Sequence, residues 1–221
     1  MRTYIGKATI MLSLFAPLAA QAQPAAEFSA NAGWVSQYYY RGILQKESSA
    51  SAGLDVTAGP VYLGTWAADV GDGSEVDVYG GLAIDIGQVS ISSGGTAYLY
   101  TGEFDNTYLE ANLGLGSGPI SVEYSVGKYD SPPDGGNTGD QQNYKFLAVT
   151  AEHMGFYGTV GTFTEDFEGS YGEVGYGFSA GDMDFTISGI KNDKHLSDPD
   201  RSAQSGGHTT MVFGVSKTFP N

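Results

Sequence analysis

Residues 108–127 read YLEANLGLGSGPISVEYSVG, which is two alternating runs joined by a turn rich in glycine. On both sides of the Gly116-Ser-Gly-Pro119 turn, apolar residues occupy every second position. Successive side chains of a strand point to opposite faces of a sheet. The period therefore predicts two antiparallel strands, each with one apolar and one polar face.

The same period-two pattern continues over nearly the whole chain, and no segment shows a helical period. Clear examples begin at Phe28, Ala50, Glu75, Met183 and Thr210. Three segments are less regular. Val61–Val70 is apolar on both faces, Val89–Tyr100 contains Gly94-Gly95, which indicates a bulge or kink, and Tyr144–His153 fits either register. We expect about twelve strands, each a short amphipathic ribbon.

The predicted connections alternate in length along the chain. Short turns are expected near Gly59-Pro60, Gly87, Gly116–Pro119, Gly155 and Ala180-Gly181. Longer links are expected at Gly42–Glu47, Gly71–Ser74, Thr101–Asn106, Ser131–Asn143, Glu165–Ser170 and Asp193–Gly207. Short turns at one end and long loops at the other are typical of bacterial outer-membrane barrels. The pattern predicts an all-β, closed antiparallel transmembrane β-barrel with short periplasmic turns, longer extracellular loops and both termini in the periplasm.

The first 22 residues have the composition of a secretory signal peptide. Arg2 and Lys7 precede an apolar segment, and Ala20-Gln-Ala22 resembles a cleavage site. The apolar segment is too short for a spanning helix, which needs about 20 residues. We therefore expect a signal peptide over 1–22 and one outer-membrane β-barrel domain over 23–221. An ordinary N-terminal helix is the alternative.

A water-soluble β-sandwich also alternates, so the choice of lipid rests on further features. Many apolar faces are long enough for a membrane strand, which needs about 9–11 residues. The polar faces carry mostly small uncharged side chains, whereas a solvent-facing sheet carries more Lys and Glu. Aromatic residues near strand ends suit the two membrane–water boundaries. The expected membrane-interface aromatics are Trp34, Tyr38, Tyr40, Tyr62, Trp66 and Phe219.

Composition excludes several classes of function. The chain has 10 Lys+Arg against 25 Asp+Glu and a net charge of −15, so we expect no nucleic-acid partner. It has no cysteine, which excludes disulfides and thiolate chemistry. Its three histidines, His153, His195 and His208, show no metal-ligand spacing, and no Gly-x-Ser-x-Gly motif is present. We expect no cofactor, no metal, no catalytic residue and no enzymatic activity.

Charged residues of the predicted strands fall on the polar face, which points into a barrel. The expected pore-lining residues are Arg41, Asp55, Glu75, Asp77, Asp85, Glu110, Glu123, Glu173 and Asp184. All but Arg41 are acidic, so a continuous aqueous path through them favours cations. The alternative is that these carboxylates pair with Arg41 or with hydroxyls and plug the barrel. Twelve strands lie between the filled eight-stranded barrel and the open porin.

The last run, Thr210–Phe219, is amphipathic and ends in an aromatic residue followed by Pro220-Asn221. Such a strand is similar to the terminal signal used in outer-membrane barrel insertion, although a final strand of a soluble domain has the same pattern. It predicts the barrel assembly machinery as a partner, in addition to outer-membrane lipids.

Several motifs resemble the TorF-type porin family, proteobacterial outer-membrane proteins formerly described as conserved hypothetical proteins. The matching motifs are SQYYYRGILQ (36–45), GPVYLGTW (59–66), EVDVYGG (75–81), YLYTG (98–102) and YLE (108–110). Their order and spacing carry the resemblance, which covers the first half of the chain after residue 22. The resemblance implies an outer-membrane β-barrel with a channel role and supplies no catalytic residues.

Three functional hypotheses follow. The leading one is a porin-like channel in the outer membrane of a Gram-negative bacterium, for passive diffusion of small solutes or ions, with weak cation selectivity. The second is a structural or adhesive barrel that acts through its extracellular loops. The third is a lipid-modifying barrel enzyme that depends on its histidines.

Overall fold

The computed structural model describes residues 26–102, 104–130, 141–197 and 207–220. These residues form twelve strands. Their bounds are β1 (Glu27–Tyr40), β2 (Ile43–Ala58), β3 (Val61–Gly71), β4 (Gly73–Ile86), β5 (Val89–Tyr100), β6 (Tyr108–Ser117), β7 (Ile120–Tyr129), β8 (Gln142–His153), β9 (Phe156–Glu165), β10 (Gly169–Ala180), β11 (Met183–Asn192) and β12 (Thr209–Pro220). The predicted signal peptide, residues 1–22, lies outside the described residues and stays a prediction.

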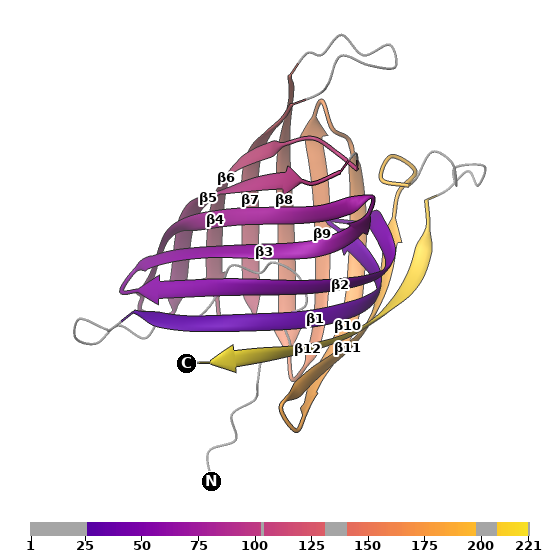
Figure 1. Cartoon of the computed structure of the whole chain (residues 1–221). Helices are drawn as coiled ribbons and strands as arrows, with labels where there is room; N and C mark the ends of the chain where they lie inside the picture. Colours follow the sequence, from indigo (N-terminus) through magenta and orange to yellow (C-terminus); the bar gives the residue numbers. More distant parts are fainter. Residues whose placement is uncertain (1–25, 103, 131–140, 198–206, 221) are drawn as a thin grey trace.

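The strands form one closed antiparallel barrel (Figure 1). Each strand pairs with its neighbours along the chain, and β12 returns to pair with β1 over Gly33↔Ser216 and adjacent positions. This confirms the predicted all-β closed barrel and its strand number. Among the described residues, no helix is long and apolar enough to cross a membrane.

The five short turns are confirmed. All five connections at one end of the barrel have two residues, and they are Gly59-Pro60, Gly87-Gln88, Gly118-Pro119, Met154-Gly155 and Gly181-Asp182. At the other end, which we call the loop rim, the connections at 101–107, 130–141, 166–168 and 193–208 are longer.

Two of the predicted long links are wrong. Arg41-Gly42 alone joins β1 to β2, and Asp72 alone joins β3 to β4. The polar residues after Gly42 extend β2, where Lys46 pairs with Tyr38 and Glu47 with Gln37. These polar residues therefore belong to a strand hairpin and not to a loop. Their polarity arises because this end of the hairpin lies away from the apolar wall.

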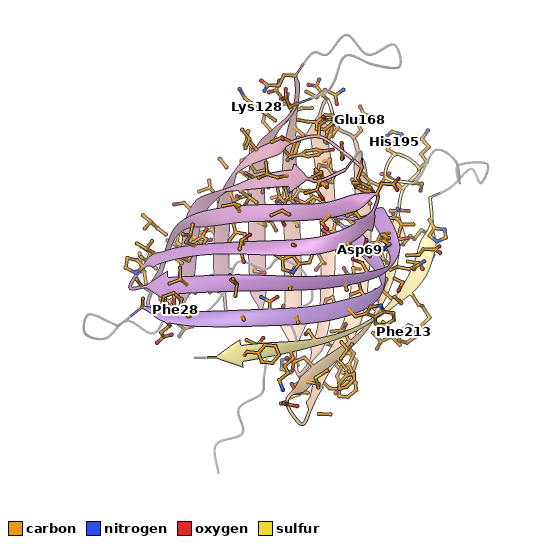
Figure 2. The ribbon with its side chains drawn as sticks, viewed as in Figure 1. Phe28, Asp69, Lys128, Glu168, His195 and Phe213 are labelled. Atoms are coloured by element: carbon orange, nitrogen blue, oxygen red, sulfur yellow. The ribbon has the colours of Figure 1, made fainter. Side chains whose placement is uncertain are left out.

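The alternation of side chains confirms which face is apolar. Leucine, isoleucine and valine side chains at every second position of the wall strands are exposed on the outside, and Leu54, Leu113 and Val174 are more than half exposed. The alternate positions of the same strands are buried or half-buried inside the ring. Figure 2 shows the labelled Phe28 away from the loop rim, where Lys128, Glu168 and His195 gather. The ring thus has an apolar outer wall and a charged rim.

Four of the six predicted interface aromatics lie inside the barrel, which corrects that prediction. Tyr38 and Tyr40 turn inward because β1 leaves β12 after Val35 and shifts its register against β2 between Tyr38 and Tyr39. On β3, which is apolar on both faces, the large rings of Tyr62 and Trp66 take the inner positions. The Trp66 ring meets Tyr38 edge-on at 5.6 Å. The Tyr62 hydroxyl lies against Gly81 and Gly94 of β4 and β5.

The other two residues of that set, Trp34 and Phe219, lie on the outer face and are about half exposed. Trp34 also donates a hydrogen bond from Nε1 to Ser48 Oγ at 3.1 Å. Their place at a membrane boundary remains a prediction.

Candidate constriction inside the barrel

The end of the β1–β2 hairpin leaves the wall and folds into the barrel. The ladder between β1 and β12 ends at Val35, and the ladder between β2 and β3 begins at Ser51. Residues 36–50 therefore pair only within the β1–β2 hairpin, and we call them the inner hairpin. In Figure 1 this indigo end turns inward toward β9 and β10.

Local backbone geometry explains the tight tip of the inner hairpin. Arg41 and Gly42 both have positive φ, at 47° and 83°, which is the geometry of the two-residue turn that best fits a twisted hairpin. Ser48 also has a positive φ of 61° and lies in a gap of the ladder between β1 and β2. Irregular pairing of this kind bends a strand, and here it directs the tip into the ring.

The tip reaches the opposite side of the barrel. Arg41 forms ion pairs with Glu110 of β6 and with Glu123 of β7, the latter at 2.6 Å. Its Nη2 also donates to Ser125 Oγ at 3.1 Å. The guanidinium lies over the ring of Phe146 at 4.1 Å from the centroid. Because β7 lies diametrically opposite β1 in the ring, these contacts bridge the lumen.

The two carboxylates that contact Arg41 differ in their exposure to solvent. The Glu110 side chain is fully buried, and Arg41 is nearly so, whereas the Glu123 side chain keeps 34% of its surface exposed. Glu110 also accepts hydrogen bonds from Tyr98 Oη at 3.0 Å and from Asn112 Nδ2 at 2.8 Å. A buried carboxylate with this many donors is held firmly. Water reaches the site from the side of Glu123.

A second pair of carboxylates lies beside the inner hairpin. Glu75 and Asp77 occupy successive inner positions of β4 and are almost completely buried. Tyr38 of the inner hairpin donates its hydroxyl to Glu75 Oε1 at 2.8 Å. Within the described residues, neither carboxylate forms an ion pair. This pair therefore differs from Glu110 and Glu123, which share Arg41.

The inner face nearer the short turns carries carboxylates paired with neutral donors. Asp55 accepts the hydroxyl of Tyr79 at 2.5 Å, and Glu173 accepts that of Tyr157 at 2.7 Å. The remaining two accept serine hydroxyls, with Ser90 donating to Asp85 and Ser179 to Asp184. These four acidic residues line the ring one by one and do not meet.

The structure places all nine predicted pore-lining residues on the inner side of the barrel, but only some come together. Arg41, Glu110 and Glu123 form one cluster, and Glu75 with Asp77 forms another. Their role in lining a pore remains a prediction, since the contacts fit both a constriction and a plug.

Sequence reasoning missed the aromatic and amide partners of this cluster. Phe146 lies in the run whose register was ambiguous, so its inward direction had no clear signal. Asn112 and Ser125 were on the polar face of the two runs quoted first, and the alternation alone was enough to find them. Asn192 stands directly before the predicted loop Asp193–Gly207, where no pattern marks it.

Asn192 anchors the tip of the inner hairpin. Its Nδ2 donates to the Gly42 carbonyl at 2.7 Å and to the Leu196 carbonyl at 3.1 Å. Its Oδ1 accepts the His208 backbone N–H at 2.7 Å. One buried amide thus ties the hairpin to the last loop and to the start of β12.

We expect Asn192→Ala to destabilise the barrel by about 1–3 kcal/mol, because buried carbonyls and an N–H lose their partner. The measurement is denaturant unfolding of the refolded protein. Asn143→Ala, at an exposed asparagine on β8, is the matched control and should change little. Equal stability of the two variants would contradict an anchoring role.

The three histidines lie apart from the cluster. His153 ends β8 at the short-turn end, whereas His195 and His208 belong to the connection between β11 and β12 at the loop rim. His195 contacts Glu168 at 3.3 Å. Among the residues that the structure describes, no group of three His, Cys, Asp or Glu side chains is arranged to hold a metal ion.

Comparison with known proteins gives one family and several similar folds. The profile of a family described as "Bacterial protein of unknown function (Gcw_chp)" matches residues 19–219. Comparison with curated proteins found no match. The NanC porin structure is similar with a TM-score of 0.52 and 13% identity, covering 86% of this chain and 98% of that chain.

A second similar chain comes from work described as "Unveiling the Mechanism Behind the in-meso Crystallization of Membrane Proteins". It aligns with a TM-score of 0.60 and 6% identity, and it covers 88% of this chain and 83% of its own. At such low identities these similarities concern the fold alone, a closed antiparallel barrel that resembles the fold of the NanC porin.

Proposed function

This chain belongs to the Gcw_chp family of bacterial proteins of unknown function, and we propose that it is an outer-membrane channel for passive diffusion of small solutes or ions. The observation that carries the proposal is the division of the barrel between an apolar outer wall and an inner face lined with carboxylates. The resemblance to the TorF-type porins supports the same function. In the orientation that we propose for the barrel in the outer membrane, the short turns face the periplasm and the loop rim faces the outside of the cell.

The outer wall supports a location in the membrane. Every strand has ten residues or more, which meets the length of a membrane strand, about 9–11 residues. Closure of the ring leaves no strand edge unpaired in hydrocarbon, where backbone groups find no other partner. Lipid is thus the expected partner of the outer wall, and the C-terminal strand is the expected contact of the assembly machinery.

The inner face supports a preference for cations. Arg41 is the only arginine in the described part of the chain, and eight carboxylates share the inner face with it. Rings of carboxylates attract cations and repel anions along a narrow aqueous path. The inner hairpin crosses the lumen to β6 and β7, so we propose a small, weakly selective conductance in place of a wide pore.

Planar-bilayer recording of the purified chain tests this function directly. Conductance steps with a reversal potential that favours the cation in a salt gradient are expected. Complete absence of steps at any voltage, for a protein whose gel migration is heat-modifiable and therefore folded, would remove the channel proposal and leave the barrel intact.

We expect Glu123→Gln to reduce the preference for cations. Glu123 is the exposed member of the Arg41 cluster, so its charge acts on ions in water, and in this variant the buried Glu110 still pairs with Arg41. The reversal potential should move toward that of a non-selective pore. Glu168→Gln, which removes a carboxylate from the β9–β10 connection at the rim, is the matched control. An equal shift in both variants would mean that surface charge, not the constriction, sets selectivity.

The two other hypotheses gain less support. Arg41-Gly42 and Asp72 replace two of the six expected long loops, which reduces the surface of an adhesive barrel. A histidine-dependent enzyme gains little support, because His153 lies at the short-turn end and His195 and His208 at the loop rim, apart from the carboxylate clusters inside the barrel. We therefore propose a function without catalysis.

A further inference from the structure

We propose that Glu75 and Asp77 form a binding site for one divalent cation such as Ca²⁺ inside the barrel. Glu75 has 1% of its surface exposed and Asp77 has none. Three of their four carboxylate oxygens, Glu75 Oε2 and both oxygens of Asp77, have no hydrogen-bond partner. Ionised carboxylates that are buried without donors are unfavourable, and a bound divalent cation would supply the positive charge that stabilises them.

The neighbouring protein cations are already engaged. Arg41 is shared between Glu110 and Glu123, and Lys46 is paired with Asp69. Counted as ionised, Arg41, Glu110, Glu123, Glu75 and Asp77 have a net charge of −3, since one positive charge stands against four negative charges. A divalent ion at Glu75 and Asp77 neutralises these two carboxylates, and oxygen donors are what Ca²⁺ and Mg²⁺ prefer.

The surroundings suit a small ion held away from bulk water. Trp66 and Tyr98 are the cross-strand neighbours of Asp77, and Ala68 and Tyr100 are those of Glu75. Tyr38 covers Glu75 from the inner hairpin and leaves Oε2 free. The rings thus exclude solvent on several sides, while the unpartnered oxygens remain available as ligands.

The contrast with Asp55 makes the site specific. Asp55 is also an inner carboxylate, two strands earlier in the chain, but its oxygens accept hydrogen bonds from Tyr79 and Asn31. A carboxylate whose lone pairs already have donors has less need of an ion. Asp55 therefore provides a matched control on the same face of the barrel.

The test uses the full chain, folded in detergent and stripped of metal with a chelator. Adding Ca²⁺ at about 100 times its Kd should raise the midpoint of thermal unfolding by roughly 5 °C or more. The rise should be lost in Asp77→Asn and in Glu75→Gln and kept in Asp55→Asn. Sodium at matched ionic strength serves as the screening control, and Mg²⁺ is tested in parallel. Glu75→Gln keeps the side-chain volume and serves if Asp77→Asn does not fold.

Several outcomes would overturn the site. These are no rise with either divalent ion, an equal rise in all variants, or the same rise with sodium. A carboxylic-acid infrared band at neutral pH that persists with Ca²⁺ and disappears in Asp77→Asn would assign a shared proton instead. The site goes beyond the proposed channel function, because binding is measured without conduction. A barrel that binds Ca²⁺ but does not conduct would keep the site and remove the channel.

Discussion

Arg41→Ala is expected to destabilise the barrel by about 3–5 kcal/mol, because it leaves the buried Glu110 without its charged partner. It should also enlarge the single-channel conductance, since the side chain that bridges the inner hairpin to β6 and β7 is removed. The two effects are measured separately, by denaturant unfolding and by planar-bilayer recording.

The control for this prediction removes the charges together. Arg41→Met combined with Glu110→Gln and Glu123→Gln keeps the approximate side-chain volumes and leaves no unpaired charge. Replacement of a buried ion pair by neutral groups is often tolerated, so we expect much of the stability to return. If Arg41→Ala unfolds at the same denaturant concentration as the unmodified protein, the Arg41 cluster does not hold the hairpin.

Leu113→Arg should destabilise the barrel in lipid by about 2–4 kcal/mol, the cost of a cationic side chain near the middle of a membrane barrel. Leu113 lies mid-strand on the outer face of β6 and is 55% exposed. Reversible unfolding in lipid vesicles measures the change. Ser117→Arg, on the same face and strand but next to the Gly118-Pro119 turn, should cost about 0–1 kcal/mol.

Equal costs at the two depths would contradict a membrane around this wall. A water-soluble barrel would tolerate arginine at either exposed position, since surface substitutions usually change stability little. The pair of variants therefore tests the lipid exposure of β6 without any assumption about conduction.

The barrel could be predicted from the sequence because the alternation of apolar and polar side chains is a local pattern. Leu109 and Leu113 face outward and Glu110 inward by alternation alone, and each tight Gly-Pro or Gly-containing turn fixes the next strand beside it. With an even number of strands, β1 and β12 run antiparallel. They pair with each other because each would otherwise have an unpaired edge. The inward direction of Glu110, Glu123 and Asp184 needs nothing more than this period.

The inner hairpin did not follow from the sequence because its causes are not local. Alternation places Tyr38 and Tyr40 on the face of Trp34. They turn inward because β1 loses β12 as a partner after Val35 and shifts its register against β2. Likewise, Gly42–Glu47 has loop-like polarity because it crosses a polar lumen, where an extended strand needs no apolar face. Contacts such as that of Arg41 with Glu123, 82 positions apart, carry no periodic signal.

The uneven connections at the loop rim have a consequence for recognition from outside the cell. On the flank built by β1–β4, the chain turns back at Arg41-Gly42 and at Asp72, whereas from β5 onward the connections at 101–107, 130–141 and 193–208 are long. In the proposed orientation, an antibody or phage therefore finds longer connections at the end of β5–β12 than at the end of β1–β4.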